Sequence, residues 1–346
     1  MNNKKNPESA GDAAGNNQMI CPESALILAP LSGYTDLAYR RAARRCGCRF
    51  SFTEMVDCSS LVYASHRGEL MLRRGDDEDF LGVQLVGAIP EHLRIAAEKL
   101  NDYDFSLLDL NLGCPVPKVY GKGAGAALGR NPELALRCFE ALAETSRFPL
   151  TVKLRIVHAV DPEPTVELVK ALVERGAKAV TVHGRTREAF YTGEINYGII
   201  RAVREAVPQV PVIANGGIVS VETAEIMRQK TGCSRLMLAQ GAMGNPWLFD
   251  KIANGANDPD LDTWKQIVYS HITDMIALYG EETALRNSRK IVHDYLKGRG
   301  FPSGFRAQAS ALARLRDLEE LLAAARPAVS RSPSARGIYC TEAERE

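Results

Sequence analysis

The stretch "SLLDLNLGCPVPKVYGKGAGAALGRNPELALRCFEALAET" (Ser106 to Thr145) contains one complete strand, loop and helix. Its apolar start, Ser106 to Leu112, predicts a buried strand, and the amphipathic segment Pro132 to Thr145 predicts a helix with proline in its first turn. A glycine-rich loop with one cysteine, Cys114, lies between them. Such a unit is typical of folds in which helices cover a parallel sheet.

The same alternation continues in both directions along the chain. Eight short apolar runs predict buried strands at 25–30, 50–55, 80–85, 106–112, 150–155, 179–184, 210–215 and 235–240. Amphipathic segments such as Pro90 to Leu100 and Pro164 to Gly176 stand between them. Eight strands at a repeat of roughly 30 residues favour an α/β protein with a TIM (β/α)8 barrel. The alternative is an open six-stranded sheet with misread edges.

The alternation stops after "NPWLFDKI" (Asn245 to Ile252), which predicts a second, smaller domain. Residues 23–255 form the expected barrel, and residues 259–326 an all-α helical domain. The polar ends, 1–22 and 327–346, have the composition of disordered tails.

Composition limits the classes of partner. The chain has 346 residues and a net charge of +1, so binding to nucleic acid or membrane would need a local patch. We find no signal peptide and no run of about 20 apolar residues, which predicts a cytoplasmic protein without a membrane partner. No obligate protein partner is evident. The eight cysteines lack disulfide or metal-site spacing, so no metal is expected.

Polar residues at the ends of the predicted strands would gather at one mouth of a barrel. They are Ser32, Glu54, Gln84, Asn111, Cys114, Lys153, His183, Asn215, Gly216, Gly217 and Gly241. Small residues after the last two strands, in "IANGGI" (Ile213 to Ile218) and "AQGAMGNPW" (Ala239 to Trp247), allow backbone N–H groups to approach a phosphate.

The set as a whole indicates a flavin mononucleotide (FMN) site. Gln84 can pair with the edge of a flavin ring, and Lys153 can place positive charge where a reduced flavin gathers negative charge. Each residue alone has a structural alternative. Lys153 could pair with a buried carboxylate such as Glu54, and His183 could be a satisfied structural histidine.

Cys114 stands in "GCP", where Gly113 frees the backbone and Pro115 stiffens it, so its side chain is expected over the mouth. A thiol has a reference pKa of about 8.5, so it is mainly protonated at neutral pH and can donate a proton. Together with hydride from a flavin, it would reduce an activated C=C bond.

A basic run lies in the predicted helical domain. Between 286 and 316 there is one acid, Asp294, and eight basic residues: Arg286, Arg289, Lys290, Lys297, Arg299, Arg306, Arg314 and Arg316. The run is either a solvated helix face or a footprint for a phosphate backbone.

At this point the sequence resembles the tRNA-dihydrouridine synthase family. The resemblance rests on "APLSGYTDLAYRR" (Ala29 to Arg41), "TEM", "VQL", "DLNLGCPVPKVYGKGAGAAL", "VKLR", "VHGRTREAFYTGEINY", "IANGGI" and "GAMGNPWLF" in the family's order. It implies an FMN-binding TIM barrel, a helical tRNA-binding domain, and reduction of specific tRNA uridines to 5,6-dihydrouridine with NADPH.

The resemblance also implies roles for single residues. Cys114 falls on the catalytic acid, and Asn111 and Arg185 fall near the substrate. The implied flavin contacts are Pro30, Leu31, Ser32, Gln84, Lys153, His183, Asn215, Gly216, Gly217, Gly241 and Ala242. "SRKIVHDYLKG" (Ser288 to Gly298) resembles a family motif within the basic run. Arg286, Arg289, Lys290 and Lys297 are therefore expected to bind tRNA.

The mechanism we expect passes hydride from reduced FMN to C6 of the uracil while Cys114 protonates C5. Gln240 departs from the family, because many members have arginine there, beside the flavin phosphate. Two alternatives stay open. One is an FMN-dependent TIM-barrel oxidoreductase acting on a small molecule, of the dihydroorotate or enoate type; the other is a non-catalytic RNA-binding barrel.

Overall fold

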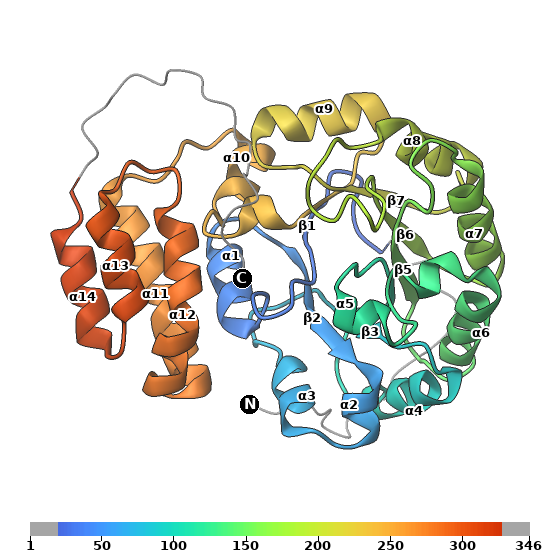
Figure 1. Cartoon of the computed structure of the whole chain (residues 1–346), viewed down its shortest axis with the longest axis horizontal. Helices are drawn as coiled ribbons and strands as arrows, with labels where there is room; N and C mark the ends of the chain where they lie inside the picture. The colour runs from blue at the N-terminus through green and yellow to red at the C-terminus, as the bar shows by residue number, and fades with distance from the viewer. Residues whose placement is uncertain (1–19, 327–346) are drawn as a thin grey trace.

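The computed structural model describes residues 20–326, so the predicted tails lie outside the described residues except for 20–22. Eight parallel strands close into a barrel in sequence order, and β1 pairs with β8 through Leu26 and Leu236. The strands are β1 (Leu26–Leu28), β2 (Phe50–Asp57), β3 (Leu81–Val86), β4 (Leu107–Leu112), β5 (Leu150–Arg155), β6 (Ala179–His183), β7 (Val212–Asn215) and β8 (Leu236–Leu238). The predicted TIM barrel is confirmed (Figure 1).

Helices surround the barrel and follow its strands in Figure 1. They are α1 (Leu37–Arg45), α2 (Cys58–Val62), α3 (His66–Met71), α4 (Pro90–Leu100), α5 (Pro117–Tyr120), α6 (Pro132–Ala143), α7 (Glu163–Glu174), α8 (Tyr197–Ala206), α9 (Val221–Thr231) and α10 (Leu248–Asn254). Two short 3-10 helices are η1 (Leu128–Arg130) and η2 (Gln240–Ala242). Proline stands in the first turn of α4, α6 and α7, where its missing N–H leaves no partner unpaired.

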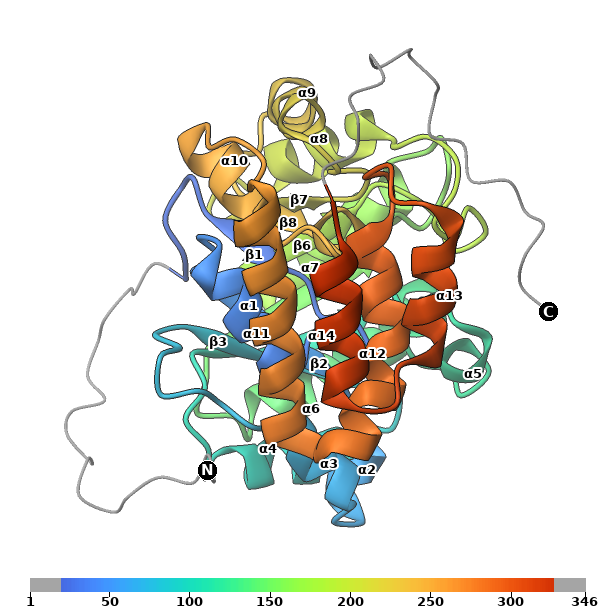
Figure 2. The ribbon, with the colours of Figure 1, turned by 90° about the vertical axis from the view of Figure 1, so that its left-hand side faces the viewer.

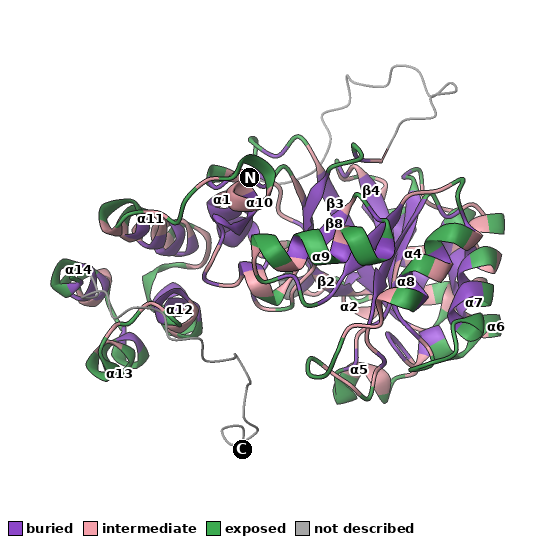
Figure 3. Ribbon diagram, turned by 90° about the horizontal axis from the view of Figure 1, so that it is seen from above, coloured by how far each residue is buried: buried purple, intermediate pink, exposed green. Residues whose placement is uncertain are grey.

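Side chains alternate in direction along each strand, so the apolar residues pack in two regions: one between the strands and the helices, and one inside the barrel. Leu108, Leu110 and Leu112 of β4 point outward and join the apolar layer under the helices. Leu107 points inward and packs inside the barrel. Because successive side chains of a strand face opposite sides, Asp109 and Asn111 also point inward. Figure 3 shows buried strands and helices whose exposed faces point away from the barrel.

The predicted helical domain is also confirmed. It consists of α11 (Leu261–Tyr279), α12 (Glu281–Leu296), α13 (Ser303–Ala311) and α14 (Leu315–Ala324), packed side by side in Figure 2. Helix α11 packs against α1 of the barrel. No helix within residues 20–326 is long and apolar enough to cross a membrane.

Two buried tyrosines of the barrel, Tyr34 and Tyr39, hold the loop after β8, and the Tyr39 ring also lies 5.3 Å from the ring of His271 in α11 of the helical domain. The Tyr39 hydroxyl donates to the Ala242 carbonyl, and Tyr34 accepts the N–H of Gly244 at 2.6 Å. In the helical domain, His271 Nδ1 lies 3.1 Å from the Tyr295 hydroxyl, and both rings are fully buried. The loop that the sequence assigns to the flavin phosphate is therefore held from the side of the helical domain.

Gly244 and Gly255 form a matched pair that tests this contact, because their φ angles are +62° and +69°. A Cβ at Gly244 would overlap the backbone of Asp294 in α12, whereas a Cβ at Gly255 would meet nothing within 4 Å. Gly255→Ala should lower the free energy of unfolding by about 1–2 kcal/mol through left-handed backbone strain. Gly244→Ala should lower it by about 1–3 kcal/mol more, through overpacking. Urea unfolding measures both, and equal losses would contradict the contact.

Candidate active site

Inward-facing side chains from β3 to β7 meet at the carboxyl ends of the strands. Asn111 pairs in register with Lys153 on β5, and His183 pairs with Asn215 on β7. Gln84 on β3 is fully buried beside them. The structure therefore brings together five of the polar side chains that the sequence placed at one mouth.

The carboxylate of Asp109 sets the direction of a chain of hydrogen bonds across this mouth. It is buried on β4 and, when ionised, it can only accept hydrogen bonds. Its Oδ1 accepts from the Thr151 hydroxyl at 2.6 Å, and its Oδ2 accepts from Gln84 Nε2 at 2.7 Å. The oxygen of the Gln84 amide is thereby turned toward Asn111, whose Nδ2 donates to it at 2.7 Å.

Asn111 carries this chain into the cysteine loop, residues 113–127, which follows β4. Its Oδ1 accepts the backbone N–H groups of Gly113 and Cys114 at 3.0 and 2.9 Å. Cys114 is half-buried, and burial raises the pKa of its thiol above the ordinary value. The thiol is therefore protonated at neutral pH, as the sequence predicted for a proton donor.

Lys153 lies in a region where positive charge is in excess. Its Nζ donates to Asn215 Oδ1 at 3.0 Å. Burial, and then the neighbouring Arg155 guanidinium, lower the pKa of Lys153 to about 8. An anion bound in the mouth would favour the charged ammonium and raise this pKa. The mouth is therefore suited to a ligand that carries or acquires negative charge.

His183 offers a buried polar atom toward the same space. The residue is 8 % exposed, and Nε2 has no hydrogen-bond partner among the described residues. Burial, and then the charge of Lys153, hold the pKa of His183 well below its usual value, so the ring is neutral. Gly216 packs against the ring, because a Cβ there would stand 2.6 Å from Cδ2 and 2.9 Å from Nε2. The unpaired Nε2 argues against a histidine that is satisfied within the fold.

The loops after β7 and β8 approach each other too closely for larger residues. A Cβ at Gly241 would overlap the backbone of Ile218 and lie 2.8 Å from the Cα of Val219. Gly217 has a φ of +66° and is exposed, and Ala242 is buried. Bare backbone at this place suits a phosphate group. Gln240, where an arginine was expected from the resemblance, is exposed.

The loop after β1 is tied to both domains. Residues 30–32, predicted to contact the flavin, lie at the mouth, and Ser32 is exposed. The next residue, Gly33, donates its N–H to the Glu54 carboxylate and accepts from Lys290 Nζ at 2.5 Å. Lys290 of the helical domain therefore supports this loop.

Arg155 has no role in the sequence-based expectations, yet it joins two loops of the mouth. Its Nε donates to the Gly113 carbonyl at 2.9 Å. Its Nη1 donates to the carbonyls of Thr186 and Phe190 at 3.1 and 2.5 Å, in the loop after β6. Burial lowers the pKa of Arg155 to about 10. The available signal was its inward position in "VKLR", two residues after Lys153.

Surface contacts reinforce this link between the cysteine loop and the loop after β6. Arg130 binds both carboxylate oxygens of Glu188 at 2.6 Å. The Arg187 guanidinium lies 4.1 Å from the centre of the Tyr120 ring. Arg185, expected near the substrate, lies at the start of the same loop and is partly buried.

The other described cysteines lie away from the mouth. Cys138 is fully buried in the apolar core under α6, which fits a small hydrophobic residue. Cys46, Cys48 and Cys58 are also buried. Within residues 20–326, no three His, Cys, Asp or Glu side chains form a group that could hold a metal ion.

The basic run of the helical domain divides into two kinds of residue. Arg286 and Lys297 are exposed and make no side-chain hydrogen bond or ion pair with the described residues. Arg289 Nε donates to the Leu312 carbonyl at 2.9 Å, and Lys290 binds the loop after β1. The Arg299 guanidinium lies 4.4 Å from the Trp247 ring centre. Part of the run therefore supports the fold.

Comparison with known proteins identifies relatives along most of the chain. The family model described as "Dihydrouridine synthase (Dus)" matches residues 27–330. "tRNA-dihydrouridine synthase B" from Pseudomonas aeruginosa is 34% identical over 307 residues, covering 87% of this chain and 91% of the relative. "Probable tRNA-dihydrouridine synthase" from Rickettsia prowazekii is 36% identical over 290 residues, covering 82% and 88%.

Solved structures with the same barrel are much more distant in sequence. Histamine dehydrogenase from Rhizobium sp. 4-9 matches with a TM-score of 0.50 and 13% identity, over 72% of this chain and 48% of its own. 2-Naphthoyl-CoA reductase matches with a TM-score of 0.51 and 9% identity, over 66% and 50%. The chain spans about half of either structure, and these likenesses show the fold alone.

Asp109 predicts a measurable dependence of stability on pH. Burial raises its pKa from 3.8 to about 6, although Thr151 and Gln84 donate to it. A group with a raised folded pKa contributes stability below its unfolded pKa, and that contribution is lost as pH rises through the folded pKa. Relative to Asp109→Asn, the natural protein should therefore lose about 2 kcal/mol of unfolding free energy between pH 4 and pH 8. Urea unfolding of both proteins across this range measures the difference, and parallel pH curves would contradict the assignment.

Proposed function

Because the chain belongs to the dihydrouridine synthase family, we propose that it reduces the C5=C6 bond of specific uridines in tRNA to 5,6-dihydrouridine. The observation that carries the proposal is the position of Cys114. Its protonated thiol stands beside a buried, positively charged mouth. The hydrogen-bond chain from Asp109 through Gln84 and Asn111 crosses this mouth and ends on the backbone N–H of Cys114. The reaction adds a hydride and a proton, with NADPH as the proposed source of the two electrons.

We propose FMN as the cofactor, because the residues of the mouth fit it. Gln84, Lys153 and His183 would hold the ring system, and the backbone of Gly216, Gly217 and Gly241 would hold the phosphate. The unpaired His183 Nε2 and the lowered pKa of Lys153 support a ligand with polar edges and negative charge. When bound and reduced, FMN supplies the hydride that adds to C6 of the uracil.

Cys114 would supply the proton to C5. Its raised pKa keeps the proton on the sulfur until the carbon acquires negative charge. The charge left on sulfur then lies near Arg155 and Lys153, whose fields favour the thiolate. The same two cations would stabilise negative charge that develops on a ligand bound in the mouth.

Access to the carbon atoms requires that the target uridine leave the base stack of the RNA. Asn111 and Arg185 are the residues we propose beside the flipped base. Asn111 keeps a fixed orientation because Gln84 and the cysteine loop use both ends of its amide. The remainder of the tRNA would lie across the helical domain, where Arg286 and Lys297 are exposed.

Replacing the thiol tests the proton donor. Cys114→Ala should retain flavin and lose about 10²- to 10⁴-fold in the rate of dihydrouridine formation, the usual contribution of a general acid. Cys138→Ala is the matched control, because that thiol is buried in the core under α6. Its rate should stay near that of the natural protein. The measurement is single-turnover product formation from flavin-reduced enzyme and unmodified tRNA; equal rates for Cys114→Ala and the natural protein would refute the role.

The free cations of the helical domain predict salt-dependent RNA binding. Arg286→Gln and Lys297→Gln should each weaken tRNA binding and lower the slope of log affinity against log salt by about 1. Lys170→Gln, on α7 and paired with Glu167, is the control and should leave the slope unchanged. The measurement is the titration of each variant with tRNA at several salt concentrations, which gives the slope. Slopes that do not change in the first two variants would assign the basic run to a solvated face.

A further inference from the structure

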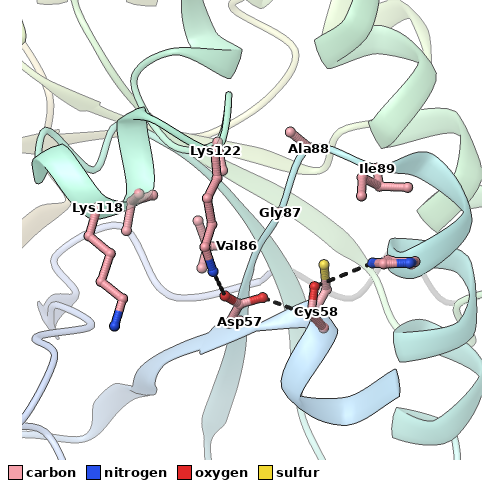
Figure 4. A pocket seen from close by; sticks show the side chains of 12 residues that line it. Asp57, Cys58, Val86, Gly87, Ala88, Ile89, Lys118 and Lys122 are labelled. Carbon is pink, nitrogen blue, oxygen red and sulfur yellow. Dashed lines mark hydrogen bonds and ion pairs between the residues drawn. The ribbon is translucent and has the colours of Figure 1, made fainter. Parts of the chain in front are cut away.

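A cavity opens on the rim of the barrel, beside the cysteine loop. It has a volume of about 120 Å³ and lies between the loops that follow β2, β3 and β4. Its polar and exposed lining includes Asp57, Ser59, Ile89, His92, Lys118 and Lys122. We call it the rim pocket. Figure 4 shows Lys118 and Lys122 on one side and Ala88 and Ile89 on the other.

The rim pocket carries one positive charge that no carboxylate balances. Lys122 Nζ lies 3.0 Å from Asp57 Oδ2, so these two charges compensate each other. Asp57 Oδ1 accepts the N–H of Ser59 at 3.0 Å. Lys118 is exposed and makes no hydrogen bond or ion pair with any described residue. Charge complementarity therefore favours an anionic ligand.

The walls of the pocket are built closely enough to hold that ligand in one place. A Cβ at Gly87 would overlap the Cys58 sulfur, so α2 and the loop after β3 approach through a glycine. His92 Nδ1 lies 3.3 Å from the Ser59 hydroxyl and joins α4 to α2. These contacts join α2 to the loop after β3 and to α4, so the side chains that form these walls are held in place.

The surroundings of the pocket resemble a surface for single-stranded nucleic acid. Tyr63 is 74% exposed and its ring lies edge-on to His92, with ring centres 6.1 Å apart. Ile89 is 51% exposed at the entrance. An exposed aromatic ring near basic residues can stack a base while the basic residues pair with phosphates. A cavity of about 120 Å³ can take a phosphate group with part of its sugar, whereas a whole dinucleotide would extend beyond it.

We propose that the rim pocket binds a backbone phosphate of the RNA strand next to the uridine that enters the mouth, with Lys118 as its counter-ion. The inference rests on the proposed function and adds a substrate contact on the barrel. Lys118 follows Cys114 by four residues in the same loop, with Pro115 and Pro117 between them. A phosphate held by Lys118 would therefore fix the loop that carries the proton donor.

The test compares lysine variants of the flavin-loaded protein. Lys118→Gln should lower the slope of log tRNA affinity against log salt by about 1 and lower kcat/KM for unmodified tRNA. Lys118→Arg, which keeps the charge, should restore both. Lys178→Gln is the matched control, because Lys178 is exposed at the amino end of β6, on the opposite face of the barrel. NADPH oxidation without RNA should be the same in all four proteins.

Two results would overturn the proposal. One is a salt slope for Lys118→Gln equal to that of the natural protein. The other is a raised KM for NADPH with unchanged RNA binding, which would assign the phosphate to the reductant. Failure of the proposed function has a different signature. A natural protein that binds tRNA but forms no dihydrouridine would contradict the reaction, and the salt slopes would still decide the rim pocket.

Discussion

One buried carboxylate orients the polar groups on which the mouth of this barrel depends. Asp109 can only accept hydrogen bonds when ionised, so Gln84 must present its NH2 group to it and its oxygen to Asn111. Asn111 must then present its own oxygen to the N–H groups of the cysteine loop. The amide edges available to a flavin or a uracil thus follow from a single acceptor in the barrel interior. The orientation of this network is fixed, because each reversed amide would leave two donors or two acceptors facing each other.

A second constraint is the excess of positive charge around Cys114. Lys153 and Arg155 both have lowered pKa values, chiefly through burial, so their charged forms are held at a cost in folding free energy. A fold carries such a cost at sites where it serves binding or chemistry. Here the two cations face the space next to the thiol. A bound anionic cofactor, the thiolate left on Cys114 and the RNA backbone would each offset that excess.

The helical domain and the cofactor loops share contacts. Lys290 of α12 donates to the Gly33 carbonyl after β1, and Gly244 after β8 packs against the backbone of Asp294 in α12. An RNA that moves α12 would therefore also act on the loops assigned to the flavin. Within the basic run, Arg289 and Lys290 have internal partners, whereas Arg286 and Lys297 are exposed.

Sequence patterns predicted the elements well and the interactions less well. The helix at Pro90 to Leu100 and the strand at Leu150 to Arg155 have the predicted bounds, because proline and the apolar run mark their ends. The eighth strand is shorter than predicted, since Gln240 begins a 3-10 turn. The roles of Asp109 and Arg155 were not predicted, because a single sequence shows residue types but not the direction of hydrogen bonds. Lys290 was assigned to RNA from the basic run and the family resemblance, and its contact with Gly33 depends on how the two domains pack.

The measurement that tests the central claim most directly is the stoichiometry of the reaction. Flavin-loaded protein is mixed with a limiting amount of NADPH and unmodified tRNA under exclusion of oxygen, and NADPH consumed and dihydrouridine formed are both counted. One dihydrouridine should form for each NADPH consumed, and without RNA no NADPH should be consumed beyond the flavin content. Consumption of NADPH with reduced flavin but no dihydrouridine in the tRNA would contradict the central claim.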